Sequence, residues 1–332
     1  MVAPSPPIDL ADGVTRRHRA AVGRALSLVE DRRPSSTETV VRLLDALRKQ
    51  SRGDSRRIGF TGPPGAGKSS LVSALARELR KRGLTVGILA VDPSSPRSGG
   101  ALLGDRARID PDPHDDGIFV RSMASGGDLG GLARAAFSAV EVLSAAFDRV
   151  LVETVGVGQS ETDVELVADT TVMVLQPASG DILQFLKAGI LEIPDVFVVN
   201  KADLGEVAER TRRDLTASVK HARAAGLAFH EPSILSVSAI DGSGVPGLAD
   251  AVGQTLDALA GSGDLAVRRR EGACAWTEKA LARRVGELGI EALGGRVALR
   301  ERVEKRVREG ACGLSIAVDL ERDAIRTLRA TA

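Results

Sequence analysis

Seven apolar runs separated by helical segments constrain the fold of this chain more than any other feature. The runs are residues 57–62, 85–92, 117–123, 149–156, 170–177, 196–203 and 233–239. Helical patterns such as Ser69–Arg82, Leu129–Phe147 and Glu206–Ala225 lie between most of them. Strands that are apolar throughout and alternate with helices are typical of a mostly parallel sheet covered on both faces. We therefore expect a doubly wound α/β domain whose ligand site lies beyond the carboxyl ends of the strands.

Helical segments flank this domain on both sides. Apolar residues at helical spacing run from about Val14 to Leu47, and Ser35 with Glu38 is spaced for a capping box. Near the other end, Trp276–Leu293 and Arg296–Arg308 have the pattern of charged amphipathic helices. The pattern predicts an N-terminal helical extension (1–54), a nucleotide-binding domain (55–262) and a C-terminal helical region (263–332) that covers its apolar stripes by dimerisation.

Composition excludes several classes of protein. Lys and Arg total 45 against 44 Asp and Glu, so a net charge of +1 gives no reason to expect binding to nucleic acid or to a membrane surface. The 332 residues include only two cysteines, which are far apart, as in a reducing compartment without a disulfide scaffold. The first residues contain no apolar leader, and no run is long enough to span a membrane. We expect a cytoplasmic protein.

A glycine-rich loop follows the first apolar run and matches the P-loop pattern G-x-x-x-x-G-K-[ST]. Its residues, with the serine that follows, are Gly62, Pro63, Pro64, Gly65, Ala66, Gly67, Lys68, Ser69 and Ser70. Glycines let backbone N–H groups converge on phosphate oxygens, and a helix N-terminus adds positive charge. Lys68 would contact the β- and γ-phosphates, and Ser69 would bind Mg²⁺. A Gly/Pro turn that simply enters a helix is the alternative.

The last four residues of the sixth apolar run indicate which base is bound. Asn200, Lys201 and Asp203 form an N-K-x-D motif, in which the Asp203 carboxylate accepts hydrogen bonds from guanine N1–H and its 2-amino group. Adenine has neither donor and would leave that carboxylate desolvated and unpaired. We expect Asn200 to brace the loop and the stem of Lys201 to cover the base plane. Downstream, the amides of three residues are placed to meet guanine O6: Ser238, Ala239 and Ile240.

Three acidic residues near strand ends are candidates for the metal and for hydrolysis. Glu153 would order Mg²⁺ through water, and Asp92 and Asp105 are candidate ligands or water-orienting groups. Alternatives remain open: Glu153 pairing with Arg149 or Arg121, and Asp92 acting in a turn before a proline. No glutamine directly follows Gly156, although Gln159 lies nearby, so we predict slow intrinsic hydrolysis. Asp181 and Lys187 lie in a third loop, residues 176–189, or simply in a solvated helix start.

Together these segments resemble one family. The segments that show the resemblance are "GPPGAGKSSL", "VDPSSPRSGGALLGDRARI", "GGLARA", "VETVGVGQSE", the 176–189 loop and "VNKAD". They are similar to the MeaB/ArgK/MMAA family of GTPases, most densely over Ile58–Asp203. The resemblance implies a GTPase that protects an adenosylcobalamin-dependent methylmalonyl-CoA mutase and gates its cofactor loading. It also implies a homodimer formed through the C-terminal helices, and GTP/GDP and Mg²⁺ as ligands.

The resemblance gives roles to individual residues. Lys68 and Ser69 match the phosphate and Mg²⁺ positions, Asp203 matches the guanine reader, and three acids match the metal and switch positions: Asp92, Asp105 and Glu153. Asp181 and Lys187 fall in a loop that in the family communicates with the mutase. Gly126–Asp128 departs from the family, which often has an arginine there, so a role of that arginine is in doubt.

Three other functions compete with this one. The first is an ATPase or kinase serving transport of lysine, arginine or ornithine, a label this family has carried, but it would not need the guanine reader Asp203. The second is a nickel-insertion GTPase, which would call for a His- or Cys-rich tract near the N-terminus. The third is a GTPase switch for another partner, which the sequence does not separate from the mutase chaperone.

Overall fold

The computed structural model describes residues 7–92, 115–124, 135–154, 163–178, 194–224 and 231–331. These residues form two compact units. One comprises 54–136 and 147–262, and the other comprises 1–53, 137–146 and 263–332. Helix α5 lies between two strands in the chain, yet almost all of it groups with the terminal helices.

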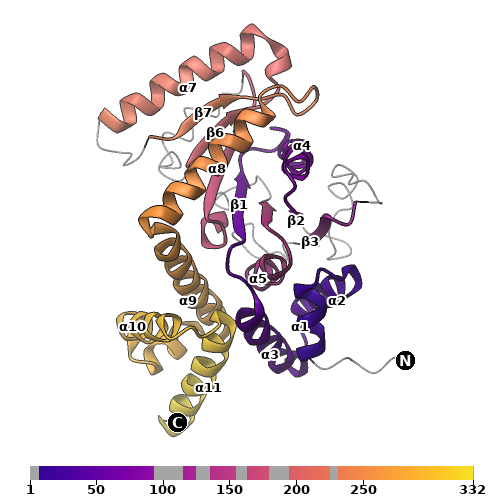
Figure 1. Ribbon diagram of the computed structural model, residues 1–332. Coiled ribbons are helices and arrows are strands. Elements are labelled where there is room, and N and C mark those ends of the chain that lie inside the picture. Colours follow the sequence, from indigo (N-terminus) through magenta and orange to yellow (C-terminus); the bar gives the residue numbers. More distant parts are fainter. Residues whose placement is uncertain are drawn as a thin grey trace, which may run out of the picture. The chain divides into compact units, whose positions relative to one another are not determined.

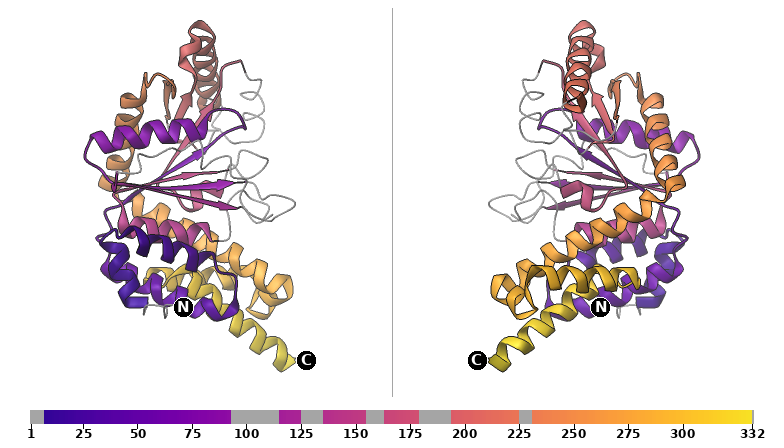
Figure 2. Two further views of the ribbon diagram at one scale, coloured as in Figure 1. Left: turned by 90° about the vertical axis from the view of Figure 1, so that its right-hand side faces the viewer. Right: turned by 90° about the vertical axis from the view of Figure 1, so that its left-hand side faces the viewer.

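The first unit is built on a seven-stranded sheet in the order β3-β2-β4-β1-β5-β6-β7 (Figure 1). All neighbouring strands are parallel, and the side views in Figure 2 show them running in one direction. The strands are β1 (Arg56–Thr61), β2 (Val86–Asp92), β3 (Ile118–Ala124), β4 (Arg149–Glu153), β5 (Thr170–Leu175), β6 (Val196–Val199) and β7 (Ser233–Ser236). The predicted parallel α/β fold is therefore confirmed.

Helices of this unit cover both faces of the sheet. Its helical elements are α4 (Lys68–Lys81), η2 (Asp163–Leu166), η4 (Ala202–Leu204), α7 (Glu206–Ala224) and α8 (Val245–Ser262). Buried residues of α4 and α8 form one aliphatic core with β1, β2, β5 and β6. Helix α7 packs on the opposite side, where Leu215 and Val219 contact Phe197 and Met173. Because both faces are covered, β5 and β6 are buried throughout, whereas the edge strands β3 and β7 are only partly buried.

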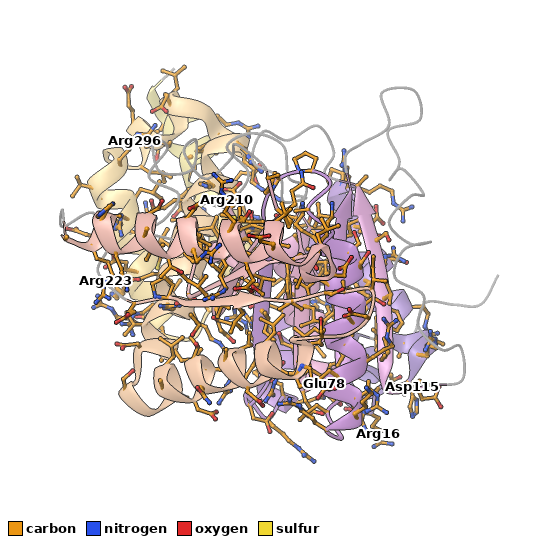
Figure 3. All side chains as sticks on the ribbon, turned by 90° about the horizontal axis from the view of Figure 1, so that it is seen from above. Arg16, Glu78, Asp115, Arg210, Arg223 and Arg296 are labelled. Carbon is orange, nitrogen blue, oxygen red and sulfur yellow. The ribbon has the colours of Figure 1, made fainter. Side chains whose placement is uncertain are left out.

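The outer faces of these helices are polar. Arg210 and Arg223 project from α7 and Glu78 from α4 (Figure 3). Glu78 pairs with Arg82 at 3.0 Å, one helical turn further on. Exposed pairs of this kind contribute little to stability, so the buried aliphatic clusters hold the unit together.

The second unit consists of helices. They are α1 (Pro7–Thr15), α2 (Arg19–Glu30), α3 (Pro34–Gln50), α5 (Ala136–Ala146), α9 (Asp264–Ala292), α10 (Gly295–Arg308) and α11 (Gly313–Thr331). The expected capping box at Ser35 is wrong, because α3 begins at Pro34 and its N-cap, Arg33, makes no side-chain cap. Instead the hydroxyl of Ser36 donates to Asp31 at 2.6 Å. No described helix is both long and apolar enough to cross a membrane.

A half-buried ion pair joins three segments of the helical unit that are distant in the sequence. Arg48 of α3 pairs with Glu141 of α5 and donates to the carbonyls of Gly310 and Ala311, at 3.2 and 2.9 Å. The thiol of Cys312 lies beside them, and its burial raises its pKa to about 12. Because one guanidinium bonds to α5 and to the turn before α11, it holds both segments against α3.

Candidate functional site

The loop between β1 and α4 has a backbone that only glycine permits at two positions. Gly62 has a φ of 138°, and a Cβ there would lie 2.1 Å from the carbonyl oxygen of Val174. Gly67 has a φ of 86°, and a Cβ there would lie 2.5 Å from Nδ2 of Asn200. Both φ values are in the region that side chains rarely adopt. The glycines of the motif therefore serve the close approach of this loop to β5 and to the loop after β6.

Lys68 is the first residue of α4 and is folded back over the loop. Its Nζ donates to the carbonyls of Gly62 and Pro63, at 2.9 and 3.1 Å, and the residue is only 8% exposed. Anionic oxygens bind an ammonium more strongly than neutral carbonyls do, so phosphate oxygens can replace these two acceptors. Ser69, the next residue, is buried, whereas Ser70 and the earlier loop residue Pro64 are exposed.

Ser69 contacts the carboxylate at the end of β4. Its Oγ donates to Oε1 of Glu153 at 2.7 Å, and both residues are buried. Glu153 lies in register with Phe60 on β1, which places it beside the strand that leads into the loop. Arg149, considered above as a partner, begins the same strand, roughly 13 Å away along it. The sequence-predicted pair of hydroxyl and carboxylate is thus brought together.

The other acidic candidates are placed less completely. Asp92 is the last residue of β2, which lies next to β4, so its backbone reaches the same edge of the sheet as Glu153. Several predicted residues lie outside the described residues: Asp105, Gly126–Asp128, Gly156, Gln159, Asp181 and Lys187. Within the described ranges, no three His, Cys, Asp or Glu residues are grouped as metal ligands.

Asn200 connects the phosphate loop to the loops that follow β6 and β7. Its Nδ2 donates to the carbonyl of Ala66 at 2.8 Å and to that of Gly67 at 3.3 Å. Its Oδ1 accepts the amide of Ala239 at 3.2 Å. The residue is buried, so these bonds are shielded from water. This is the bracing role that its position in the motif predicts.

Asp203 is exposed on the short helix η4, where a ligand can reach it. Its Oδ1 accepts a hydrogen bond from the hydroxyl of Ser238 at 2.6 Å, which fixes the orientation of the carboxylate. The amide of Ser238 donates to the carbonyl of Ser243 at 2.9 Å, and the amide of Ile240 lies 3.3 Å from Oγ of Ser238. The predicted base-binding residues are therefore adjacent, although the Ser238 amide already has a partner within the chain.

One contact at this site was not anticipated from the sequence. The Nζ of Lys201 donates to Oε1 of Gln176, the residue directly after β5, at 2.8 Å. Gln176 opens the 176–189 segment that resembles the family, but that resemblance gave this glutamine no role. The strand order holds the missing information, because β5 lies between β1 and β6 and its end must lie between the two loops.

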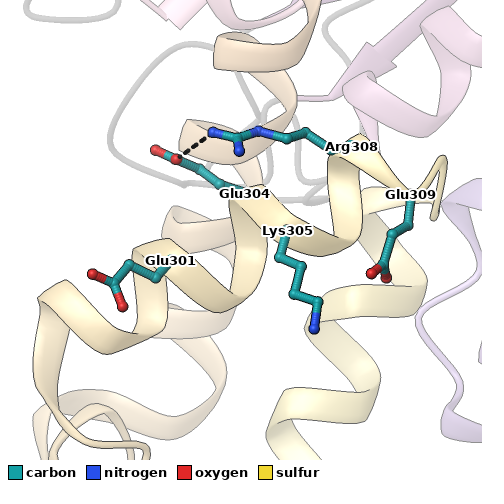
Figure 4. Close-up of a pocket in the computed structure, with 5 residues that line it drawn as sticks. All are labelled: Glu301, Glu304, Lys305, Arg308 and Glu309. Carbon is teal, nitrogen blue, oxygen red and sulfur yellow. Dashed lines mark hydrogen bonds and ion pairs between the residues drawn. The ribbon is translucent and has the colours of Figure 1, made fainter.

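A surface hollow elsewhere is not part of this arrangement. It has a volume of about 450 Å³ and lies along α10 in the helical unit (Figure 4). Its lining is charged throughout and consists of Glu301, Glu304, Lys305, Arg308 and Glu309. Glu304 and Arg308 pair with each other at 3.4 Å. None of these residues belongs to a nucleotide-binding motif.

Comparisons with known proteins agree with the geometry. The family model described as "Methylmalonyl Co-A mutase-associated GTPase MeaB" matches residues 22–292. A Mycobacterium tuberculosis protein named "Probable GTPase Rv1496" is 40% identical over 314 residues, which cover 91% of this chain and 90% of that protein. The mouse "Methylmalonic aciduria type A homolog, mitochondrial" is 32% identical over 327 residues, 94% of this chain and 77% of the mouse protein.

A solved structure has the same fold over nearly the whole chain. The crystal structure of a protein named LAO/AO transport system kinase superposes with a TM-score of 0.64 at 26% identity, covering 93% of this chain and 99% of that one. The matched family model spans most of the chain and includes the phosphate loop, Glu153 and the guanine-binding loop. With that match and the relatives above, this chain belongs to the MeaB family of methylmalonyl-CoA mutase-associated GTPases and is itself a GTPase.

Proposed function

We propose that this GTPase is a chaperone of an adenosylcobalamin-dependent methylmalonyl-CoA mutase, which it protects and whose cofactor loading it gates. The observation that carries the proposal is the family match over residues 22–292, because the description of that family names association with the mutase. The match includes the whole nucleotide-binding unit and much of the helical unit. The name of the mouse relative refers to the same metabolite class.

Different residues would bind the phosphates and the base of GTP. The ammonium of Lys68, now held by two loop carbonyls, would move to the β- and γ-phosphates, since charged acceptors bind it more strongly. The N-terminus of α4 adds partial positive charge at the same place. The Asp203 carboxylate, oriented by Ser238, would accept the guanine N1–H and 2-amino donors.

Mg²⁺ fits the oxygen groups beside the phosphate loop. The Ser69 hydroxyl and the Glu153 carboxylate are 2.7 Å apart, and both are hard oxygen donors of the kind that Mg²⁺ prefers. Ser69 would hold the ion directly and Glu153 through water, with Asp92 and Asp105 as further acids of the site. A bound ion would neutralise charge on the phosphates during hydrolysis. Full ligation by protein is unnecessary, because Mg²⁺ usually keeps several waters.

A homodimer is the second part of the proposal. Large apolar side chains are exposed on the C-terminal helices, among them Leu288 at 71% and Val297 at 75%. Apolar residues on so charged a surface favour burial against a second copy. Light scattering should therefore show a dimer at micromolar concentration, and Val297→Glu should shift it toward the monomer. Ile8→Glu, at an exposed apolar position of α1, is the matched control and should leave the mass unchanged.

An ATP-dependent transport kinase is the competing function, and the name of the solved neighbour favours it. The N-K-x-D motif argues against it, because an ATP site has no use for a carboxylate that would accept the two guanine donors. Competition binding separates the two functions. GDP should displace a labelled guanine nucleotide, and ADP should fail to do so at a hundredfold higher concentration.

The mutase proposal is tested with purified components. The protein is mixed with an adenosylcobalamin-dependent methylmalonyl-CoA mutase, with GDP or with a non-hydrolysable GTP analogue, and complexes are resolved by size-exclusion chromatography. We expect a complex whose stability depends on the nucleotide, and slower inactivation of the mutase during turnover. A mutase that elutes alone and inactivates at its usual rate under every condition would refute the proposal.

A further inference from the structure

We propose that Gln176 is a positioning residue of the guanine site and that it acts through Lys201. Its amide oxygen receives the hydrogen bond from Lys201 Nζ, at 2.8 Å. Both residues are half-buried, so the bond is partly shielded from solvent. The inference rests on guanine-nucleotide binding at this site and adds a residue that lies outside the P-loop and the N-K-x-D motif.

The location of Gln176 follows from the sheet. Leu175, the last residue of β5, lies in register with Val199, the last residue of β6. Gln176 and Asn200 are therefore the first residues beyond two adjacent strands, and Lys201 comes one residue later. On its other side Gln176 reaches the phosphate loop, because a Cβ on Gly65 would lie 3.9 Å from its Oε1.

The backbone of Lys201 is already fixed without the glutamine. Lys201 has a φ of 59°, a left-handed conformation that costs about 1 kcal/mol for a side-chain-bearing residue. The following amide, that of Ala202, donates to the carbonyl of Val237 at 3.1 Å. What remains to be ordered is the four-carbon stem, which would lose conformational entropy on covering a base. An acceptor at the end of the stem orders it before the nucleotide binds and so reduces that loss.

The turn that carries Gln176 is anchored as well. Two residues on, the amide of Ala178 lies 3.3 Å from Oγ1 of Thr211 on α7. That hydroxyl also donates to the carbonyl of Val207 at 3.0 Å, within the helix. The backbone that carries Gln176 is thus attached on one side to β5 and two residues later to α7, which fixes the position from which its side chain reaches Lys201.

The chemistry of the side chain suits this role. A neutral amide accepts a hydrogen bond from the ammonium but leaves its positive charge intact. The stem and charge of Lys201 can therefore both act on the electron-rich face of a purine, where a cation is favourable. The effect should depend on the presence of a base and should be absent for ligands that have only phosphates.

The experiment uses the full-length protein and the variants Gln176→Met, Gln176→Glu, Lys201→Met and the double variant Gln176→Met/Lys201→Met. Affinities for GDP and for inorganic pyrophosphate are measured with Mg²⁺ by competition against a fluorescent guanine nucleotide. Gln254→Met, an exposed glutamine on α8, is the matched control. Thermal unfolding without nucleotide shows that each variant is folded.

We expect Gln176→Met to weaken GDP binding roughly fivefold, the value of one hydrogen bond, and to leave pyrophosphate binding unchanged. Gln176→Glu retains an acceptor but pairs with the ammonium and neutralises its charge, so this variant should bind GDP more weakly than the wild type. Because Gln176 acts through Lys201, the double variant should bind GDP no more weakly than Lys201→Met alone.

Two results would overturn the inference while leaving the guanine site intact: equal GDP affinity of Gln176→Met and wild type, or a double variant in which the losses add. An equal loss for GDP and pyrophosphate would assign Gln176 to the phosphate loop instead and would also reject the proposal. If the wild type itself bound no GDP, the site assignment would fail first and this inference with it.

Discussion

The two ends of the nucleotide site are built in different ways. The phosphate end is buried and depends on backbone conformation: Gly62 and Gly67 allow approaches that no side chain would permit, and Lys68 is 8% exposed. The base end is open and depends on side chains, with Asp203 exposed and Ser238 orienting its carboxylate. Close backbone packing thus restricts which residues the phosphate end tolerates, whereas hydrogen-bonding side chains would select the nucleotide at the base end.

This difference predicts different consequences of mutation. A change at the phosphate end should damage folding and binding together, because backbone packing and phosphate contacts use the same atoms. A change at the base end should alter which nucleotide is preferred while the protein remains folded. The four predictions that follow test this division, beginning with the largest effect.

The largest effect is expected from Gly62→Ala. The added Cβ meets a backbone carbonyl at 2.1 Å at a φ of 138°, so β1 and β5 must separate. We expect the free energy of unfolding to fall by about 3 kcal/mol or more and GTP binding to be lost. The matched control is Gly83→Ala, where φ is 81° but nothing lies within 4 Å of the new methyl, and a loss of only about 1 kcal/mol is expected. Urea unfolding measures both, and equal losses would contradict the steric argument.

Lys68→Ala should come next. Removing the ammonium deletes a charge-assisted contact to the phosphates, so GTP affinity should fall by about a hundredfold or more. Its matched control is Lys81→Ala, the same substitution at the exposed last residue of α4, which should bind GTP normally. Isothermal titration calorimetry gives both affinities. Unchanged binding by Lys68→Ala would show that the phosphates lie elsewhere.

Asp203→Asn should change selectivity more than stability. The amide offers a donor where guanine presents one, and so it suits xanthine, whose 2-position carries an oxygen. We expect the preference for guanine over xanthine nucleotides to fall by about tenfold or more, with unfolding shifted by less than about 1 kcal/mol. Competition binding with GDP and XDP measures the ratio. A variant that retains its guanine preference would contradict the base assignment.

The smallest effect is expected at the exit of β5. Ala178 has a φ of 58°, and Ala178→Gly should relieve that strain and stabilise the protein by about 0.5 kcal/mol after the entropic cost of glycine. The control Ala217→Gly, at an exposed position inside α7, should destabilise it by about 1 kcal/mol. Thermal unfolding measures both stability changes. If they have opposite signs, backbone conformation also matters at the base end, where Ala178 lies.

Much of the fold could be predicted because its determinants are local. Apolar runs separated by helical patterns predicted the parallel sheet, which is confirmed because strands buried on two faces leave a clear pattern in sequence. The N-K-x-D motif predicted that Asn200 would brace a loop, and its amide bonds to the loop between β1 and α4. The metal-binding and catalytic roles of Asp92, Asp105 and Glu153 stay predictions.

Other features depend on contacts that no local pattern encodes. Gln176 required the strand order, and the capping box at Ser35 failed because α3 already begins at Pro34. Helix α9 begins at Asp264, earlier than the predicted start at Trp276, and continues past a non-helical residue at Gly286. The first turns of α9 are rich in charged residues and have little apolar periodicity, so the sequence pattern did not predict them. Packing against α10 and α11 stabilises the helix instead.

The single amide of Asn200 has a further consequence for which ligands the protein accepts. Because its nitrogen bonds to Ala66 and its oxygen to Ala239, one short side chain sets the distance between the two loops that we propose bind the diphosphate and the base. The ribose that joins the base to the diphosphate must match that distance. Analogues with an extended or acyclic linker should therefore be rejected even when they carry an intact guanine and an intact diphosphate.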